Sequence, residues 1–236
     1  MKFCLRRNFK KCVKCKDKEN MIDFHTHTIF SDGELIPSEL VRRAVVKGYE
    51  AIALTDHVDS SNIDFVLPRI VKVANELNKY WKIRVLPGVE ISHVPLEEMD
   101  KLVKFARKKG AKIVVVHGET TMEPVLPGTN RRAIECGADI LAHPGRLSKE
   151  DAKLAAAKGV YIEITTRKNH SGTNKEVIAA AKGAGAKLIL DTDSHGDADL
   201  VDDQKAVDFL RGLGLSEEDI KTIFANSREL LQKKIR

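Results

Sequence analysis

Residues 112–117 read Lys-Ile-Val-Val-Val-His, in which four consecutive apolar residues lead into a histidine. Such a run is typical of a strand in a parallel sheet, because helices cover both faces of the sheet and every side chain is buried. Six further short runs of aliphatic and β-branched residues along the chain also predict strands. The seven predicted strands are 21–26, 50–55, 83–90, 111–117, 138–143, 159–165 and 186–193.

Longer amphipathic segments separate these strands. Strand and helix alternate seven times, which favours a (β/α) barrel over a doubly wound open sheet. Because no long linker and no short-period repeat interrupts the alternation, we expect an α/β fold with one domain over residues 21–236. The predicted helices are 37–47, 64–80, 96–109, 130–136, 148–158 and 174–184, followed by a helical tail from 199 to 235.

The positive charge of the chain is concentrated at its N-terminus. The 236 residues carry 40 Lys+Arg and 34 Asp+Glu, for a net charge of +6. Residues 1–20 contain eight of the basic and two of the acidic residues, so residues 21–236 are balanced. We therefore expect a flexible basic extension over 1–20 and a neutral body, and we do not expect the body to bind nucleic acid.

The sequence also predicts a cytoplasmic protein. No apolar run approaches the roughly 18 residues that a membrane-spanning helix needs, so no membrane partner is expected. Lysines interrupt the N-terminus before an apolar signal core can develop. In a reducing compartment the four cysteines are not expected to form disulfides.

The extension contains Cys4, Cys12 and Cys15, but a zinc ribbon needs a second cysteine pair that is not present. An upstream translation start remains an alternative origin for these residues, because Met21 begins the first strand directly.

Histidines gather at one position in the strand pattern. Six of the eight stand at or just after the C-terminal end of a predicted strand, and three carboxylates occupy equivalent places. In a parallel barrel these strand ends meet at one rim, where active sites lie. We predict a metal centre with nine ligands: His25, His27, Asp32, His57, Glu90, His117, His143, Asp193 and His195.

Spacing supports this prediction. His25 and His27 are separated by one residue, so both project to the same side of an extended strand. Asp193 and His195 share that spacing, and Asp23 and Asp191 continue it one step deeper. These two deeper carboxylates either hydrogen-bond ligand imidazoles from behind or bond the neighbouring backbone.

The ordered set of motifs resembles the PHP family, named for polymerases and histidinol phosphatases, across residues 21–236. No ligand position departs from the family pattern. The motifs are Asp23-Phe-His-Thr-His27, Ser31-Asp-Gly33, Leu54-Thr-Asp-His57, Pro87-Gly-Val-Glu90, Val116-His-Gly118, Leu141-Ala-His-Pro-Gly145 and Asp193-Ser-His195.

This resemblance implies a distorted (β/α)7 TIM-like barrel that holds two or three divalent metal ions. The mixed imidazole and carboxylate ligands agree with zinc, manganese or iron. By likeness, the first ion is held by His25, His27, Glu90 and Asp193, the second by Glu90, His117 and His143, and the third by Asp32, His57 and His195.

The activity implied is hydrolysis of a phosphomonoester of a small metabolite by a metal-bound hydroxide, as in a histidinol phosphatase. We predict catalytic roles for Glu90, Asp193 and His195. Two alternatives stay open: a phosphodiesterase or nuclease acting on nucleotides or nucleic acid, and, less favoured, a non-catalytic RNA-binding barrel. Complete metal ligation counts against the RNA-binding barrel.

Residues of the loops after the fifth and sixth strands are the predicted contacts of the small phosphorylated substrate. Basic side chains there can grip phosphate. Glu119 and Thr120 are further rim candidates, and the alternative for Glu119 is that it opens a loop. We assign His93 a structural role, and we predict that Arg146, Arg167, Lys168 and His170 bind substrate.

Overall fold

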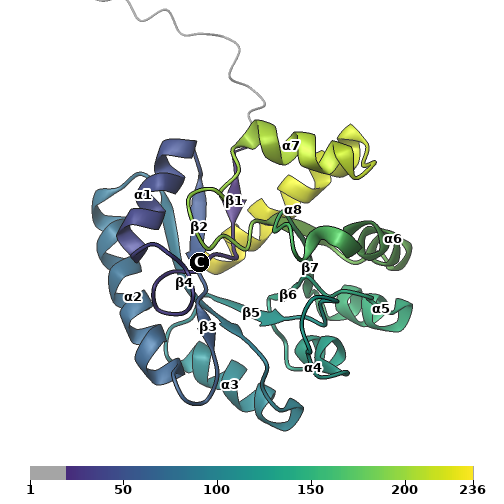
Figure 1. Cartoon of the computed structure of the whole chain (residues 1–236), viewed down its shortest axis with the longest axis horizontal. Coiled ribbons are helices and arrows are strands. Elements are labelled where there is room, and N and C mark those ends of the chain that lie inside the picture. The colour runs from purple at the N-terminus through teal and green to yellow at the C-terminus, as the bar shows by residue number, and fades with distance from the viewer. Residues whose placement is uncertain (1–19, 236) are drawn as a thin grey trace, which may run out of the picture.

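Parallel strands form the centre of the molecule in the computed structural model, which describes residues 20–235 (Figure 1). The strand order is β1-β2-β4-β5-β6-β7-β8, and β3 pairs with β4 beside this path. Every pairing is parallel. The strands are β1 (Ile22–Asp23), β2 (Ala51–Leu54), β3 (His57–Val58), β4 (Arg84–Ile91), β5 (Ile113–His117), β6 (Ile140–Ala142), β7 (Tyr161–Thr165) and β8 (Leu188–Asp191).

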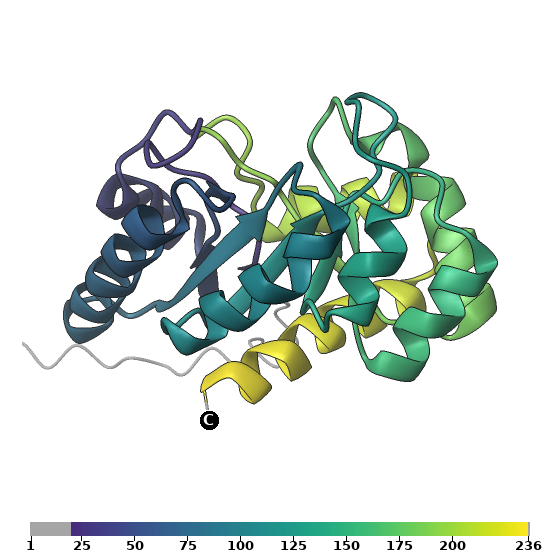
Figure 2. The ribbon, with the colours of Figure 1, turned by 90° about the horizontal axis from the view of Figure 1, so that it is seen from below.

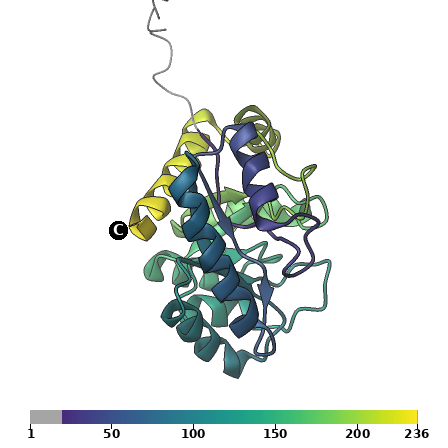
Figure 3. The ribbon, with the colours of Figure 1, turned by 90° about the vertical axis from the view of Figure 1, so that its left-hand side faces the viewer.

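Helices surround the strands on the outside. Figure 3 shows α1 and α2 lying along the outer face beside β2 and β4. A three-residue 3-10 turn at Ser171–Thr173 precedes α6. The helices are α1 (Pro37–Lys47), α2 (Ile63–Tyr80), α3 (Leu96–Lys108), α4 (Thr129–Glu135), α5 (Lys149–Lys158), α6 (Asn174–Ala184), α7 (Asp203–Gly212) and α8 (Glu217–Ile235).

The predicted single-domain α/β barrel is confirmed. Each of the seven predicted strands overlaps an observed strand, with β4 ending one residue beyond its predicted range, and the six predicted helices are present. Two details differ. The short strand β3 was not predicted, because its two residues carry no apolar run of their own, and the helical tail is divided into α7 and α8 around Gly214, which has φ +89°. Of the predicted extension only Asn20 lies within the described residues.

The barrel closes incompletely between β1 and β8. A single parallel bridge joins Thr26 to Ser194, and the N–H of His27 donates to the carbonyl of Ser194 at 2.8 Å. A side chain takes the place of further backbone hydrogen bonds between these two strands, because the N–H of Phe24 donates to Asp191 Oδ1 at 2.6 Å. The distorted closure brings the segments after β1 and β8 together at the rim.

Helix α8 covers the end of the barrel opposite the long loops (Figure 2). Its Leu230 and Leu231 join the apolar cluster inside the barrel, with Phe24, Ile113 and Tyr161. The floor of the barrel is therefore filled with apolar side chains, which leaves the other rim for polar chemistry. No helix within residues 20–235 has the length and apolarity needed to cross a membrane.

Candidate metal centre

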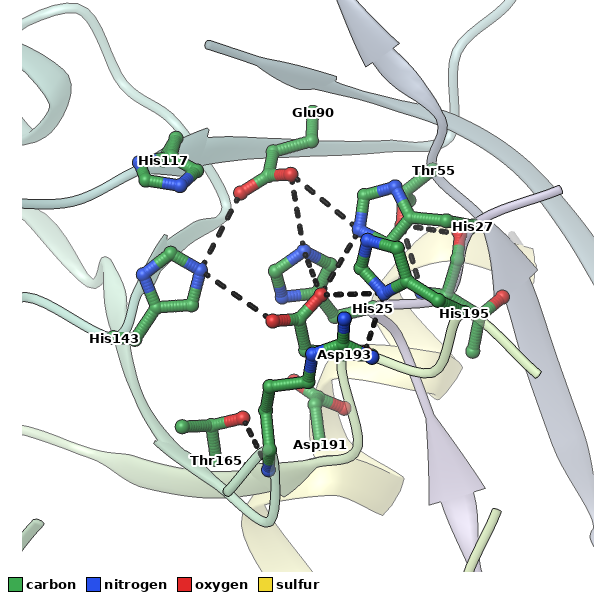
Figure 4. A network of polar contacts seen from close by, with 12 residues as sticks. His25, His27, Thr55, Glu90, His117, His143, Thr165, Asp191, Asp193 and His195 are labelled. Atoms are coloured by element: carbon green, nitrogen blue, oxygen red, sulfur yellow. Dashed lines mark hydrogen bonds and ion pairs between the residues drawn. The ribbon is translucent and has the colours of Figure 1, made fainter. Parts of the chain in front are cut away.

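Four side chains converge above the ends of β1, β4 and β8 (Figure 4). His25 Nε2 lies 3.2 Å from Glu90 Oε2 and 3.6 Å from Asp193 Oδ1. His27 Nε2 lies 3.5 Å and 3.1 Å from the same two oxygens. Ligand atoms placed tetrahedrally around zinc at about 2.0–2.1 Å would be about 3.3 Å apart. The spacing of this first group therefore suits one ion.

Glu90 also faces a second group. Its Oε1 lies 3.7 Å from His143 Nε2, on the side away from His25 (Figure 4). The His143 ring is 4.5 Å from the ring of His117, centre to centre. His117 Nδ1 donates to the carbonyl of Gly118 at 3.1 Å, which leaves Nε2 available for a metal. Glu90 thus lies between the two groups, as a bridging carboxylate would.

The third group lies at the open mouth of the barrel. Asp32 Oδ2 is 3.1 Å from His195 Nε2, and Asp32 Oδ1 is 3.7 Å from His57 Nε2. The Asp32 side chain is 56% exposed, so this group is accessible to solvent. His57 Nδ1 lies 2.7 Å from Glu90 Oε2 and connects the third group to the other two. All nine predicted ligands are therefore brought into one mouth.

Unpartnered buried atoms are concentrated in this mouth. Within residues 20–235 they include His25 Nε2, both ring nitrogens of His27, both carboxylate oxygens of Glu90 and Nδ1 of His143, none of which has a hydrogen bond of good geometry. Each unsatisfied buried polar atom costs about 1–3 kcal/mol. Divalent ions would satisfy most of these atoms, so the residues present fit a metal centre.

Two carboxylates and one imidazole of the group have the charge states that bind metals, whereas nearby carboxylates outweigh burial to hold the pKa of His25 well above its usual range and raise that of His57 to about 9, so an ion would displace protons from those two rings. Burial would raise the pKa of Glu90, but the imidazoles of His25 and His57 outweigh it and hold that pKa well below its usual range. Burial would likewise raise the pKa of Asp193, and neighbouring imidazoles lower it. For His27, burial lowers the pKa to about 4. At neutral pH these carboxylates are ionised and the His27 ring is neutral, as metal coordination requires.

Strained backbone marks the same rim. Three residues other than glycine have positive φ in the described part of the chain: His93 at +54°, His143 at +25° and Asp193 at +51°. Such conformations cost of the order of 1–3 kcal/mol each and persist mainly at functional sites. Two of the three are predicted ligands, and the third lies just after β4.

Comparisons with known proteins assign a family. The PHP domain matches residues 23–117, a stretch that contains six of the nine predicted ligands. An uncharacterized protein of Methanocaldococcus jannaschii, MJ1295, is 46% identical over 214 residues, which cover 89% of this chain and 98% of that protein. The chain belongs to the PHP family. A probable phosphatase of Shewanella frigidimarina is 28% identical, over 84% of this PHP protein and 87% of its own length.

Among solved structures, the PHP chain is similar to histidinol phosphate phosphatase of Lactococcus lactis, crystallised with zinc, L-histidinol and phosphate. The TM-score is 0.58 at 19% identity, and the match covers 83% of this chain and 94% of that one. At this level of identity the likeness supports the barrel fold.

Asp23 and Asp191 contact backbone rather than imidazole nitrogens. Asp23 Oδ1 accepts from the N–H groups of His25 and Thr192, each at 3.2 Å, and its Oδ2 accepts from the Thr192 hydroxyl at 2.6 Å. Asp191 accepts from the N–H of Phe24. Burial raises the pKa of Asp23 to about 7 and that of Asp191 well above its usual range. These contacts match the second of the two interpretations offered by the sequence.

Glu163, in the middle of β7, is the carboxylate that lies behind a predicted ligand. Its Oε2 is 2.6 Å from His25 Nδ1, and both side chains are fully buried. The sequence prediction missed this residue. A signal was present, because a charged residue stands alone within the apolar strand Tyr161-Ile-Glu-Ile-Thr165.

Glu123, in the loop between β5 and α4, is a second missed carboxylate. Its oxygens lie 3.0 Å from His93 Nε2, 3.3 Å from His117 Nε2 and 3.5 Å from His170 Nε2. His93, assigned only a structural role from the sequence, is thus a half-exposed member of the rim. No periodicity or motif distinguishes Glu123 in the sequence, so only the folded loop identifies it.

The predicted substrate contacts lie on the expected loops. Arg167 Nη1 donates to Asp199 Oδ2 at 2.9 Å and to the carbonyl of Asp193 at 3.4 Å, beside the first group. The ring of His170 stacks on His143, with centres 4.4 Å apart. Arg146 and Lys168 are exposed on the loops after β6 and β7.

The two further rim candidates have different contacts. Thr120 Oγ1 lies 2.7 Å from His170 Nδ1 at the rim. Glu119 accepts from the N–H groups of Gly128 and Asn130 at 3.0 and 2.9 Å, which stabilises the start of α4. The carboxylate of Glu119 therefore organises a loop.

Proposed function

We propose that this PHP protein, a metal-dependent phosphoesterase, hydrolyses a phosphomonoester of a small metabolite. The observation that carries the proposal is the position of Glu90 between two groups of imidazoles at the base of an open mouth. The name of the Shewanella relative, and the phosphate and L-histidinol bound in the Lactococcus structure, support the same chemistry.

The ligand sets follow from the three groups, and their nitrogen and oxygen atoms suit zinc, manganese or iron. Bound ions of this kind supply a nucleophile derived from water at neutral pH and neutralise the charge of a phosphate group. The first set is His25, His27, Glu90 and Asp193, the second is Glu90, His117 and His143, and the third is Asp32, His57 and His195.

The side chains of this protein would then orient the phosphate. Arg167 lies next to the Asp193 carbonyl, where its guanidinium can donate to phosphate oxygens after exchange from Asp199. His170, stacked on His143, is placed to contact the substrate from the rim. Arg146 and Lys168 add positive charge on the neighbouring loops, and His195 lies at the solvent-exposed third group.

A small substrate fits this protein better than a polymer does. Residues 21–236 carry equal numbers of basic and acidic residues, whereas binding to a phosphate backbone depends on a basic surface. We therefore retain phosphodiester cleavage as the outcome that would contradict the proposal. A cytoplasmic location is part of the same proposal and rests on the sequence alone.

The test is a substrate panel with the purified full-length chain in the presence of manganese or zinc. We expect release of inorganic phosphate from one or more phosphorylated metabolites, among them an amino-alcohol phosphate such as L-histidinol phosphate. Cleavage of bis(p-nitrophenyl) phosphate or oligonucleotides without any phosphomonoesterase activity would overturn the proposal. A fully metallated protein that is inert towards the whole panel would do the same.

Glu90→Gln is the first predicted variant. Removing the charge of the carboxylate between the two groups should lower kcat by at least about 100-fold and reduce the number of bound ions. Phosphate release and elemental analysis on the same sample would measure both effects. Glu176→Gln, on the exposed face of α6, is the matched control and should behave as wild type. Retained turnover in Glu90→Gln would remove the bridging role.

A further inference from the structure

Three imidazole nitrogens face one carboxylate on the rim side of the second group. Glu123 Oε2 lies 3.3 Å from His117 Nε2 and 3.0 Å from His93 Nε2, while Oε1 lies 3.5 Å from His170 Nε2. None of the nine ligands predicted from the sequence comes from this loop.

The distance from Glu123 to His117 is similar to the distances within the first group. There, imidazole and carboxylate atoms are separated by 3.1–3.6 Å. The distance from His117 Nε2 to Glu123 Oε2 falls in that range. Two ligand atoms bound to one zinc ion would be about 3.3 Å apart. An ion held at His117 Nε2 is therefore within reach of the Glu123 carboxylate.

Hydrogen bonds of the neighbouring groups leave Nε2 of His117 available to bind an ion. His117 Nδ1 donates to the carbonyl of Gly118, so in the neutral ring Nε2 carries the lone pair that would bind an ion. His93 Nε2, at 3.0 Å from the same Glu123 oxygen, can donate its proton and orient the carboxylate from the rim. The Glu123 side chain is 37% exposed, so it can meet an ion without complete desolvation.

Local structure holds the loop in this position. Gly118 and Gly145 allow the loops after β5 and β6 to pack directly on one another, because a Cβ at either residue would overlap a backbone carbonyl oxygen. The amide side chain of Asn130 donates to the Pro144 carbonyl at 2.8 Å and its oxygen accepts from the Glu119 N–H at 2.9 Å. These contacts fix the two ends of the loop that carries Glu123.

We propose that Glu123 is a tenth protein ligand of the metal centre, binding the ion held by His117 and oriented by His93. This inference rests on the metal centre of the proposed function and adds a carboxylate to the second ion. The added negative charge is on the open side of that ion, where an incoming phosphate would compete with it.

Metal binding, measured without reference to turnover, tests this assignment. The full chain is stripped with a chelator and titrated with Co²⁺, followed by its visible absorption, and with Zn²⁺ in competition with a chromophoric chelator. In Glu123→Gln, one ion should bind at least about tenfold more weakly, the lower end of what the loss of a supporting partner costs. The Co²⁺ spectrum of that ion should also change. His93→Gln should weaken the same ion less, and Glu176→Gln should match wild type.

The possible outcomes separate this inference from the proposed function. If wild type binds its ions and Glu123→Gln gives the same affinities and the same Co²⁺ spectrum, Glu123 is only an ion-pair partner of the imidazoles and the inference fails alone. If wild type binds no divalent ion, the proposed function fails with it. A far-ultraviolet circular dichroism spectrum equal to wild type would show that the half-exposed loop variant is folded.

Discussion

Two residues at the base of the mouth differ in role although both carry a carboxyl group. Asp191 and Glu163 are both fully buried carboxylates close to His25 or its chain neighbours. Asp191 accepts from the Phe24 backbone and so belongs to the seam between β1 and β8. Glu163 contacts the His25 ring itself, at 2.6 Å from Nδ1. A carboxylate in that position fixes the tautomer and directs Nε2 towards a metal.

Glu163→Gln is therefore expected to weaken the binding of one metal ion by about 10–100-fold while the chain stays folded. Glutamine keeps an acceptor for the Nδ1 proton but loses the charge that makes His25 a stronger ligand. Chelator competition on the purified variant measures the effect. Asp191→Asn, which keeps the acceptor for the Phe24 N–H, is the buried control and should change metal affinity much less. Equal effects in both variants would contradict the distinction.

Elements divide the barrel into an apolar floor and a polar rim. The interior cluster is capped by Leu230 and Leu231 of α8, which crosses the end of the barrel opposite the mouth. Polar contacts fix α8 in place: Asn226 Nδ2 donates to the Leu188 carbonyl at 2.9 Å, and Lys234 pairs with Asp139. The last helix is therefore part of the core.

Leu230→Ala should lower the free energy of unfolding by about 2–5 kcal/mol, because it removes a buried side chain from the closed end of the barrel. Urea denaturation followed by circular dichroism measures this change. Val46→Ala is the matched control, since Val46 is 71% exposed on α1, and it should change the stability by about 0.5 kcal/mol or less. A Leu230→Ala effect as small as that of the control would show that α8 does not seal the floor.

At the scale of the whole molecule, ligands from β3, β4 and β5 and from the segments after β1, β6 and β8 meet at one rim. The chain must be folded for them to meet, so ion binding and folding are linked. Ions that bind the folded chain at 100 times their dissociation constant add about 2.7 kcal/mol of stability.

Metal removal should accordingly lower the Tm by about 5–10 °C for a chain of this size. Differential scanning calorimetry of stripped protein, with and without added zinc, measures the shift at neutral pH. Glu90→Gln should show a smaller shift on the same titration, because it has lost a ligand from two groups. A Tm that does not respond to chelator or to zinc would contradict a metal-linked fold.

Much of this architecture is predictable because its determinants are local. Continuous apolar runs, such as Ile113–Val116, give the parallel strands, and amphipathic segments give the helices. Histidines at strand ends predict the position of the metal centre, because the direction of a strand decides on which rim of the barrel its last residues lie. Short elements escape prediction: β3 exists because His57 pairs with Glu90 in register.

The sequence by itself determined the barrel and the nine candidate ligands, since the alternation of strands and helices decides the first and the position of side chains at strand ends decides the second. It also located the excess charge of +6 in residues 1–20, which indicated that phosphate binding must come from metal ions and rim residues. The tertiary structure alone decided which carboxylates touch which imidazoles. Packing across the barrel sets the distance from Glu163 to His25, and the conformation of the loop after β5 sets the distance from Glu123 to His117.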